Sequence, residues 1–314
     1  MFFYIHQDSL CLIQTGYNTN RTGARMKYIY ILNRFKLLKH TDEIIRRLKK
    51  VSAELDRDYE IVINESVEDA KNNIKNFKDT EYIITAIGGD GSINLLLNNL
   101  VDTKNILSFV PHGTGNDFCR ACFEKLEDGI HDVDIIRIND SYFINIACFG
   151  IDADVANDDN FIRNRFIPGS MRYDAGLIYH FFAYKTRKMK IECDGESIEK
   201  ELSTVVVANN QYYGGGYRIA PESLIDDGQM EVYVVDKLNK IKMASIIHSL
   251  KDGSHLNNPA LQAFKAKKAV ISSDKPIRAN FDGEPMETCR FELEIIPKGF
   301  RIEFNKDFIN RIKL

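Results

Sequence analysis

Short apolar runs alternate with longer segments of helical period from residue 26 onward. Four runs rich in Ile, Val and Tyr predict buried strands, at residues 27–32, 59–63, 82–87 and 106–110. Between them, residues 41–55 place apolar side chains at helical spacing, and residues 66–77 open with a serine cap followed by acidic residues. This rhythm predicts a parallel sheet wrapped by helices.

The pattern changes after about residue 134 to short strands separated by turn signals. These strands are expected at residues 142–148, 203–209, 229–235, 269–272, 277–281 and 291–296. One helix is expected among them, at residues 240–250. Short strands interrupted in this way favour an antiparallel sandwich.

The expected fold class is therefore α/β, with a Rossmann-like parallel-sheet nucleotide domain followed by a mostly antiparallel β-sandwich domain. The first domain is expected over residues 26–135 and the second over 136–298, with the active site in the cleft between them. Residues 1–25 read as an extension that is disordered or foreign to the native protein, which would then start at Met26. Residues 299–314 are expected to form a C-terminal segment that packs back on the first domain.

The composition excludes several classes of protein. With 44% hydrophobic and 28% charged residues, the chain of 314 residues is typical of globular proteins. Its net charge of -3 gives no general attraction to nucleic acid. No apolar run approaches the roughly 18 residues that span a membrane, and no basic start marks a secretory signal. We therefore expect a cytoplasmic protein, whose six unpaired cysteines are free thiols.

A glycine loop follows the third predicted strand directly. Residues 87–92 read IGGDGS and lead into a helical stretch at 93–100. Adjacent glycines let backbone N–H groups approach a phosphate, and the helix start adds a favourable dipole. Asp90 supplies a carboxylate for a phosphate-bound Mg²⁺. The alternative is a plain glycine turn in which Asp90 accepts backbone hydrogen bonds.

A second glycine loop follows the fourth predicted strand, where residues 111–118 read PHGTGNDF. Ligands of open parallel sheets bind at the carboxyl ends of the strands. Two adjacent strand ends with a glycine loop and an Asp each are therefore expected to face one site. Two unrelated surface turns are the alternative.

Together the two loops resemble the diacylglycerol kinase catalytic-domain family, which includes bacterial lipid kinases, sphingosine kinases and ceramide kinases. The resemblance continues in the family's order through Asp134, YFIN at 142–145, GIDA at 150–153, GGG at 214–216, AP at 220–221, DDG at 226–228 and DGE at 282–284. It implies that ATP and Mg²⁺ are used to phosphorylate a hydroxyl of diacylglycerol or a related lipid. The product would be phosphatidic acid or its equivalent, as in phospholipid biosynthesis.

The resemblance also implies roles for individual residues. The catalytic residues would be Asp282 as general base, with Asp90, Asp117 and Asp134 as an acidic network around the nucleotide-bound Mg²⁺. The nucleotide-binding residues would be Gly88, Gly89, Gly91, Ser92, Gly113, Thr114, Gly115, Asn116, Arg120 and Glu284. The metal ligands would be Asp90 and, at a second, structural site, Asp226 and Asp227. For both Asp-Gly sequences, a simple hairpin turn is the alternative.

The chain departs from the family after the first strand. Relatives carry an Asn-Pro loop with Gly and Lys, whereas residues 33–39 read NRFKLLK. A loop without glycine offers fewer backbone donors to a phosphate, so either Lys36 or Lys39 replaces them by charge or nucleotide affinity is weak. This departure motivates one alternative, a catalytically weak, regulatory lipid-binding homologue. The other is an NAD kinase, which shares the GGDG loop but not PHGTGND or the terminal DGE.

The implied partner is a lipid substrate, so a cytoplasmic protein would meet the membrane surface transiently and peripherally. Apolar residues at 161–184 could supply a path for the lipid between the domains. Basic residues near an anionic surface gain about 1 kcal/mol each, and such residues cluster at Lys185, Arg187, Lys188 and Lys190. An ordinary solvated face is the alternative. No nucleic acid and no transmembrane segment are expected, while the identity of the lipid and the oligomeric state, a homodimer included, stay open.

Overall fold

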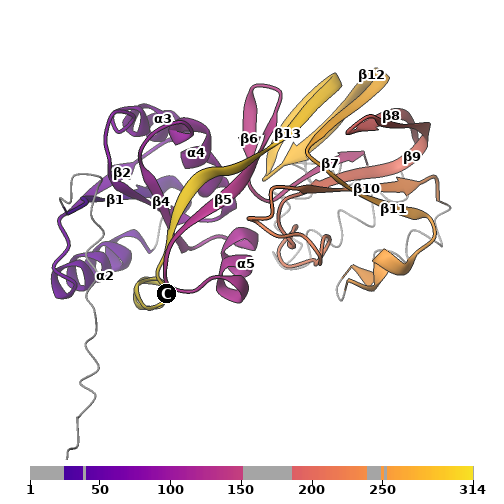
Figure 1. The fold of residues 1–314 in the computed structure, drawn as a ribbon. Coiled ribbons are helices and arrows are strands. Elements are labelled where there is room, and N and C mark those ends of the chain that lie inside the picture. Colours follow the sequence, from indigo (N-terminus) through magenta and orange to yellow (C-terminus); the bar gives the residue numbers. More distant parts are fainter. Residues whose placement is uncertain (1–24, 38–39, 151–185, 239–248, 251–252, 314) are drawn as a thin grey trace, which may run out of the picture.

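The computed structural model describes residues 25–37, 40–150, 186–238, 249–250 and 253–313. Within these residues, an α/β part and a β-rich part lie side by side (Figure 1). Most of the helix predicted at 240–250 and the lipid path predicted at 161–184 lie outside the described residues, as does the extension up to residue 24.

Four parallel strands form the sheet of the α/β part. In spatial order they are β2 (Tyr59–Asn64), β1 (Tyr28–Asn33), β3 (Ile83–Gly88) and β4 (Ile106–Pro111). β1, β3 and β4 are buried along their whole length, which suits near-continuous apolar strands covered on both faces. β2 has only β1 as a described neighbour and is half-buried.

Helices cover both faces of this sheet (Figure 1). α3 (Val67–Lys75) and α4 (Asp90–Leu100) pack on one face, and α2 (Thr41–Glu54) packs on the other. α2 buries Ile44, Leu48 and Val51, one apolar stripe at helical spacing. Two shorter helices follow strand ends: α1 (Arg34–Leu37) directly after β1, and α5 (Asp117–Lys125) after β4 and the second glycine loop.

Antiparallel strands build the β-rich part around its own apolar core. They are β6 (Ser141–Phe143), β7 (Ile146–Gly150), β8 (Arg187–Cys193), β9 (Glu196–Ala208), β10 (Met230–Asp236), β11 (Leu261–Ala266) and β12 (Lys268–Phe281), with the 3-10 helix η1 (Ser254–Asn257) before β11. The prediction of a single strand at 142–148 is wrong, because this segment forms two separate strands, β6 and β7. At the junction of β6 and β7, the N–H groups of residues 144–146 donate to the carboxylate of Asp282 instead of to a neighbouring strand.

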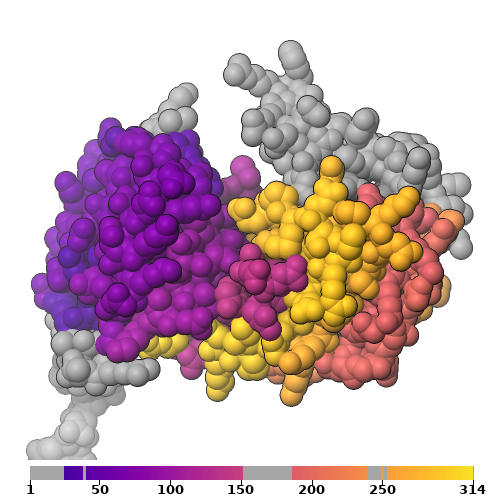
Figure 2. All heavy atoms as spheres, turned by 90° about the horizontal axis from the view of Figure 1, so that it is seen from above, coloured from indigo at the N-terminus to yellow at the C-terminus, as the bar shows by residue number. Residues whose placement is uncertain are grey.

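Two long strands join the two parts. β5 (Gly129–Ile138) and β13 (Glu284–Phe304) pair with each other, and β13 ends by pairing in parallel with β4. All described strands therefore belong to one hydrogen-bonded set. The boundaries predicted at 135/136 and 298/299 both pass through these strands. In the space-filling view, magenta and yellow residues lie between the indigo and salmon ends of the molecule (Figure 2).

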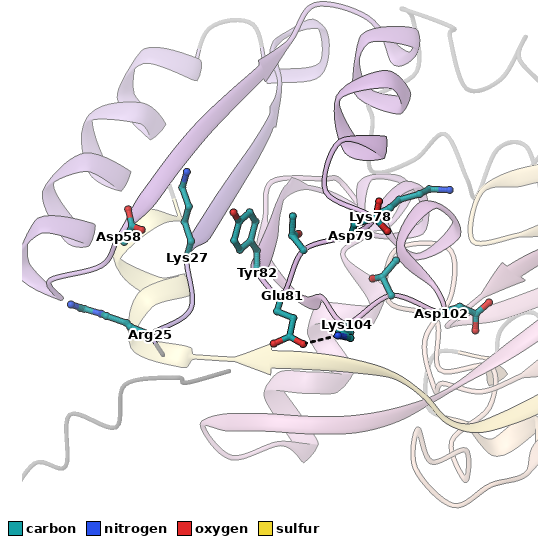
Figure 3. Close-up of a pocket in the computed structure, with 11 residues that line it drawn as sticks. Arg25, Lys27, Asp58, Lys78, Asp79, Glu81, Tyr82, Asp102 and Lys104 are labelled. Carbon is teal, nitrogen blue, oxygen red and sulfur yellow. Dashed lines mark ion pairs between the residues drawn. The ribbon is translucent and has the colours of Figure 1, made fainter. Parts of the chain in front are cut away.

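A polar hollow lies at the edge of the sheet where the strands begin (Figure 3). Its lining comes from the residues just before the strands and includes Lys27, Asp58, Tyr82 and Lys104. Every lining side chain is polar or charged, so the hollow is unsuited to acyl chains. It contains none of the site residues predicted from the sequence, and the two glycine loops follow the opposite ends of β3 and β4.

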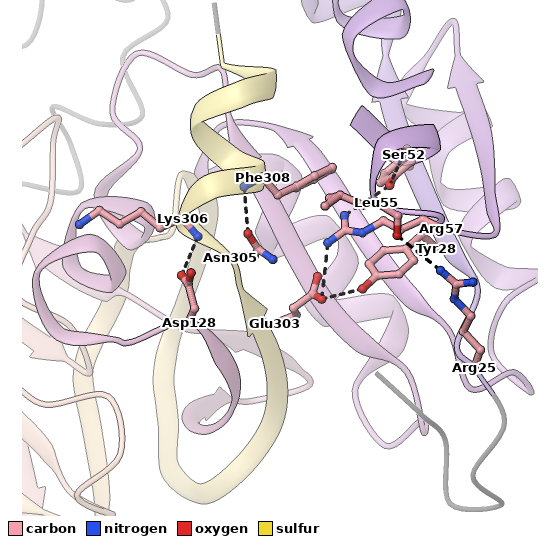
Figure 4. A network of polar contacts seen from close by, with 11 residues as sticks. Arg25, Tyr28, Ser52, Leu55, Arg57, Asp128, Glu303, Asn305, Lys306 and Phe308 are labelled. Atoms are coloured by element: carbon pink, nitrogen blue, oxygen red, sulfur yellow. Dashed lines mark hydrogen bonds and ion pairs between the residues drawn. The ribbon is translucent and has the colours of Figure 1, made fainter. Parts of the chain in front are cut away.

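A buried charge pair attaches the C-terminal segment to the α/β part (Figure 4). The Arg57 guanidinium lies between the rings of Tyr28 and Phe308, 4.0 and 4.1 Å from their centroids. It is 3.9 Å from the carboxylate of Glu303, which also accepts a 2.8 Å hydrogen bond from the Tyr28 hydroxyl. Phe308 belongs to α10 (Lys306–Ile312), which packs against α2. Removing one member of such a pair leaves a buried charge, at a cost of about 3–5 kcal/mol.

Candidate active site

The two glycine loops touch each other, backbone to backbone. A Cβ at Gly89 would lie 2.9 Å from the Cα of Gly113, and a Cβ at Gly113 would lie 2.5 Å from the Cα of Gly89. The N–H of His112 donates to the carbonyl oxygen of Gly88 at 2.8 Å. Because neither position has room for a side chain, the sequence requires glycine at both.

Asn116 closes the second loop on itself. Its side-chain oxygen accepts the N–H of Gly113 at 2.9 Å, and its side-chain nitrogen donates to the Gly113 carbonyl at 2.7 Å. Its φ of 54° lies in the left-handed region, which asparagine tolerates better than most residues. Thr114, at the loop tip, is exposed. The structure thus gives Asn116 a loop-closing position, while its contact with a nucleotide stays a prediction.

Asp90 connects the first loop to α5. It is the first residue of α4, and its two oxygens accept the N–H groups of Asp117 and Phe118, each at 3.1 Å. A carboxylate at a helix N-terminus is favourable because it satisfies free N–H groups and the helix dipole. Asp90 accepts backbone hydrogen bonds, as in the glycine-turn alternative, but from the first residues of α5, and its role with a metal stays a prediction.

Asp117 is a buried carboxylate with one oxygen uncommitted. Oδ2 accepts the N–H of Gly215 at 2.9 Å, whereas Oδ1 is buried and has no hydrogen-bond partner among the described residues. Burial raises the pKa of Asp117 to about 6, and the charge of Asp90 contributes to the same shift. A buried, unpartnered carboxylate oxygen is a suitable ligand for a hard cation such as Mg²⁺.

The donor set near Asp117 is small. Within the described ranges, no three His, Cys, Asp or Glu side chains are grouped so that they could hold a metal ion. Mg²⁺ in kinase sites is usually held by one or two carboxylates together with substrate phosphates. The residues present therefore fit an ion that arrives with a nucleotide.

Asp282 is buried in the turn between β12 and β13. It has a φ of 49°, and the following Gly283 has a φ of 92°. Its carboxylate accepts the N–H groups of residues 144–146 at 2.8, 3.1 and 3.3 Å. Burial nevertheless raises the pKa of Asp282 to about 7, and the charge of Asp90 adds to the rise. Asp90 therefore acts electrostatically on both Asp117 and Asp282. Glu284 is exposed, at the start of β13.

Asp134 lies with the DDG turn rather than with the glycine loops. Its oxygens accept the N–H of Gly228 at 2.6 Å and the N–H of Lys298 at 2.7 Å. Burial raises the pKa of Asp134, and the charges that contribute are those of Asp227 and Asp226. The sequence grouped this residue with the nucleotide-bound Mg²⁺, but its contacts indicate a part in holding the turn.

The DDG turn lies beside Lys265, which was not among the residues predicted for the site. Asp226 is exposed, whereas Asp227 accepts the N–H of Gln229 at 3.1 Å and lies 3.4 Å from the ammonium of Lys265. Lys265 also lies 3.2 Å from the buried carboxylate of Glu231. These contacts are those of a turn that leads into β10, and the second metal site stays a prediction.

Two basic residues lie beside the loops in different ways. The ammonium of Lys36, on α1, would lie 3.7 Å from a Cβ at Gly91, so it reaches over the first glycine loop. The guanidinium of Arg120 would lie 3.1 Å from a Cβ at Gly216 and so faces the β-rich part. Lys39, the other candidate for replacing the missing glycines, lies outside the described residues.

Two lysines of the predicted basic patch are ion-paired. Lys188 and Lys190, on β8, form ion pairs with Glu199 and Glu192 at 2.5 and 2.6 Å. They alternate with buried apolar side chains, as on a strand with one solvent-exposed face. Lys185 lies outside the described residues. The alternative of an ordinary solvated face therefore fits the described part of the patch better.

Family profiles match both parts of the chain. The diacylglycerol kinase catalytic domain matches residues 27–144, and the YegS C-terminal NAD kinase beta sandwich-like domain matches residues 145–304. The chain belongs to the diacylglycerol kinase family of lipid kinases. This confirms the family predicted from the glycine loops, and the kinase chemistry of the family implies the use of ATP.

Individual members of the diacylglycerol kinase family are similar over most of their length. "Probable lipid kinase YegS-like" from Shewanella frigidimarina is 30% identical, over 68% of this chain and 74% of that protein. The diacylglycerol kinase of Bacillus subtilis is 27% identical, over 64% of this chain and 71% of that protein. Neither the profiles nor these relatives support the NAD kinase alternative as the activity.

A solved structure shows the same fold. A crystal structure of a diacylglycerol kinase from Bacillus anthracis aligns with a TM-score of 0.68 and 20% identity, covering 90% of this chain and 98% of that one. The fold is thus α/β with a C-terminal antiparallel β-rich region, as in that lipid kinase. Among the described residues, no helix is long and apolar enough to cross a membrane.

Proposed function

We propose that this lipid kinase transfers the γ-phosphoryl group of ATP to the hydroxyl of diacylglycerol, or a closely related lipid, at the membrane surface. With diacylglycerol the products are ADP and phosphatidic acid. The observation that carries the proposal is Asp282, a buried carboxylate held by the N–H groups of residues 144–146, with a pKa that burial, and to a lesser extent the charge of Asp90, raises to about 7. A general base works best when its pKa lies near the operating pH.

In the proposed reaction, the lipid hydroxyl oxygen attacks the γ-phosphorus while the bond from phosphorus to the β–γ bridging oxygen breaks. The hydroxyl proton passes to the carboxylate of Asp282, and ADP leaves. The transition state is loose, so positioning and charge stabilisation supply most of the catalysis. The glycine loops contribute backbone N–H groups that approach the phosphates without side-chain obstruction.

The carboxylates at the loops, Asp90 and Asp117, would hold the metal. Mg²⁺, when bound with ATP, neutralises charge on the phosphate oxygens. Asp117 supports this role through its uncommitted Oδ1. Asp90 fixes the backbone of Asp117 through the hydrogen bond from its N–H.

Mass spectrometry of products tests the proposed function. The purified protein is incubated with ATP, Mg²⁺ and a mixed lipid extract, and the lipids are searched for a gain of one phosphate. Phosphatidic acid is the expected product. If diacylglycerol is untouched while another lipid gains phosphate, the kinase stands and its substrate is that lipid. The absence of any nucleotide-dependent phosphorylation would instead favour the regulatory homologue suggested by residues 33–39.

Replacing Lys36 with Met is expected to weaken ATP binding about tenfold. The ammonium of Lys36 lies over Gly91, and a hydrogen bond to a charged group contributes about 1.5 kcal/mol. Titration calorimetry with ATP and Mg²⁺ measures the dissociation constant directly. The matched control is Lys104→Met, because Lys104 lies at the opposite edge of the sheet, 3.3 Å from Glu81. Equal dissociation constants for both variants and the wild type would remove Lys36 from the phosphate site.

A further inference from the structure

One segment of the β-rich part touches both halves of the proposed site. Residues 212–217, here called the glycine turn, lie between β9 and β10. Three consecutive glycines form its tip, with φ values of 68°, 88° and 109°. The N–H of Gly215 donates to Asp117 at 2.9 Å, and a Cβ at Gly216 would lie 3.1 Å from the guanidinium of Arg120. The left-handed backbone and the close approach both require glycine.

The base of the glycine turn holds the turn that carries Asp282. Tyr213 is 7% exposed, and its hydroxyl donates to the side-chain oxygen of the buried Asn280 at 2.9 Å. The same oxygen accepts the N–H of Gly283 at 3.1 Å, which closes the turn from residue 280 to residue 283. Tyr213 therefore fixes the side chain that shapes the backbone around Asp282.

A further contact attaches the glycine turn to α5. The hydroxyl of Tyr212 donates to the carboxylate of Glu124, 2.7 and 2.9 Å from its two oxygens. The Arg120 guanidinium lies 5.6 Å from the centroid of the Tyr212 ring. α5 begins at Asp117, so the same short segment contacts both ends of this helix.

We propose that Tyr213 is a positioning residue for the general base, and that the glycine turn sets the placement of Asp282 relative to Asp117. This inference rests on the proposed function, because it assigns Asp282 and Asp117 to the two sides of one reaction. Phosphoryl transfer requires the acceptor hydroxyl, its base and the phosphate to be aligned, and a misplacement of about 1 Å can cost 10²-fold in rate. The glycine turn contacts Asp117 through the N–H of Gly215, and through the hydroxyl of Tyr213 it contacts Asn280, two residues before Asp282.

Tyr213→Phe tests the proposal by removing one hydroxyl. We expect kcat to fall about tenfold while the dissociation constant for ATP changes less than about twofold, because a lost buried hydrogen bond displaces Asp282 but leaves the glycine loops intact. The acidic limb of the pH–rate profile should also move to lower pH. The displaced carboxyl gains access to water, which reduces the effect of burial on its pKa. The ionised group of the loops that acts on Asp282 is Asp90, and it is unchanged in this variant.

Tyr30→Phe is the matched control. Tyr30 is buried on β1, and its hydroxyl bonds to Ser52 at 2.8 Å and accepts from Arg57 at 3.5 Å, so the variant loses buried hydrogen bonds away from the site. It should lower the melting temperature as Tyr213→Phe does, with kcat and the pH profile unchanged. If both variants lose kcat in proportion to stability and neither moves the pH profile, Tyr213 is merely structural and the proposal fails.

A carboxyl-carbon NMR titration of Asp282 separates this proposal from the proposed function. It requires no turnover, and the wild type should titrate near 7. A lower pKa of Asp282 in Tyr213→Phe, but not in Tyr30→Phe, supports the positioning role. An unchanged Asp282 titration overturns that role, whatever the lipid assay shows. A lipid assay that fails in the wild type overturns only the proposed function.

Discussion

Asp282→Asn is expected to lower kcat on the lipid substrate by about 10² to 10⁴, with the dissociation constant for ATP little changed. Asn keeps the size of the side chain and one oxygen for the N–H groups of residues 144–146, but it cannot accept the hydroxyl proton. The base acts on the acceptor hydroxyl and not on the nucleotide, so its loss affects turnover rather than nucleotide binding. Steady-state kinetics and ATP titration on the same preparation measure both quantities.

The activity of the wild type should also depend on pH, because the proposed base must be ionised to act. Because burial raises the pKa of Asp282 to about 7, the base is protonated and inactive below that pH. The kcat/KM of the wild type, which reports the pKa of the free enzyme, should fall as pH decreases through about 7, by roughly tenfold per unit once the protonated form dominates. In Asp282→Asn this acidic limb should disappear. A limb of unchanged position and slope in the variant would place the base elsewhere.

Asp194→Asn is the matched control for Asp282→Asn. Asp194 and Gly195 form another Asp-Gly turn with positive φ, and the Asp194 carboxylate accepts the N–H groups of Lys267 and Lys268 at 2.8 and 2.9 Å. Its turn joins β8 to β9, away from the glycine loops. The control therefore changes a similar carboxylate in a similar turn, and its kcat should equal that of the wild type.

Asp90→Ala is expected to reduce turnover by at least about 10³, because it removes a carboxylate that accepts the N–H of Asp117 and that we propose as a metal ligand. The structure adds a second effect. The N–H groups of Asp117 and Phe118 lose their acceptor, so the free energy of unfolding should fall by about 1–3 kcal/mol. Activity at saturating lipid and a urea unfolding curve separate the two effects.

Two further variants serve as comparisons for Asp90→Ala: Asp90→Asn, which removes only the charge, and Asp128→Ala, which removes a carboxylate elsewhere. Asp90→Asn retains an acceptor oxygen, so it should recover part of the stability but little of the activity. Asp128 accepts one backbone N–H, from Lys306 at 2.8 Å, so its removal should cost stability alone. Near-wild-type kcat in Asp90→Asn would show that the negative charge of Asp90 is dispensable.

Local pattern predicted the elements whose burial follows from their own sequence. The strands of the α/β part and helix α2 carry apolar side chains at the period that their burial requires, and the predicted bounds lie within about two residues of the observed ones. The two glycine loops were equally readable. Each follows an apolar strand directly, and neighbouring strand ends in a parallel sheet meet at one edge.

Structural features that depend on residues far apart in the chain could not be predicted from local sequence pattern. β8 was read as a basic patch because its lysines dominate, although Met189 and Ile191 alternate with them on a buried face. β13 was expected over six residues and spans 21, because its polar first half pairs with β12 and its last half with β5. Likewise, no local signal shows that Asp134 bonds to Gly228 and Lys298, which lie far along the chain.

The path of β13 also affects how the protein is made. The strand that pairs with β4 arrives only with residues 302–303, long after residues 106–111 have left the ribosome. At about 5 to 20 residues per second, β4 waits roughly 10 to 40 s for this neighbour. Protease sensitivity of ribosome-stalled chains, compared before and after residue 303 emerges, would report the interval. During this interval the backbone N–H and C=O groups on one side of β4 are unpaired, and such an edge strand can pair with other chains. We therefore expect chaperones to bind the nascent kinase at this stage of synthesis.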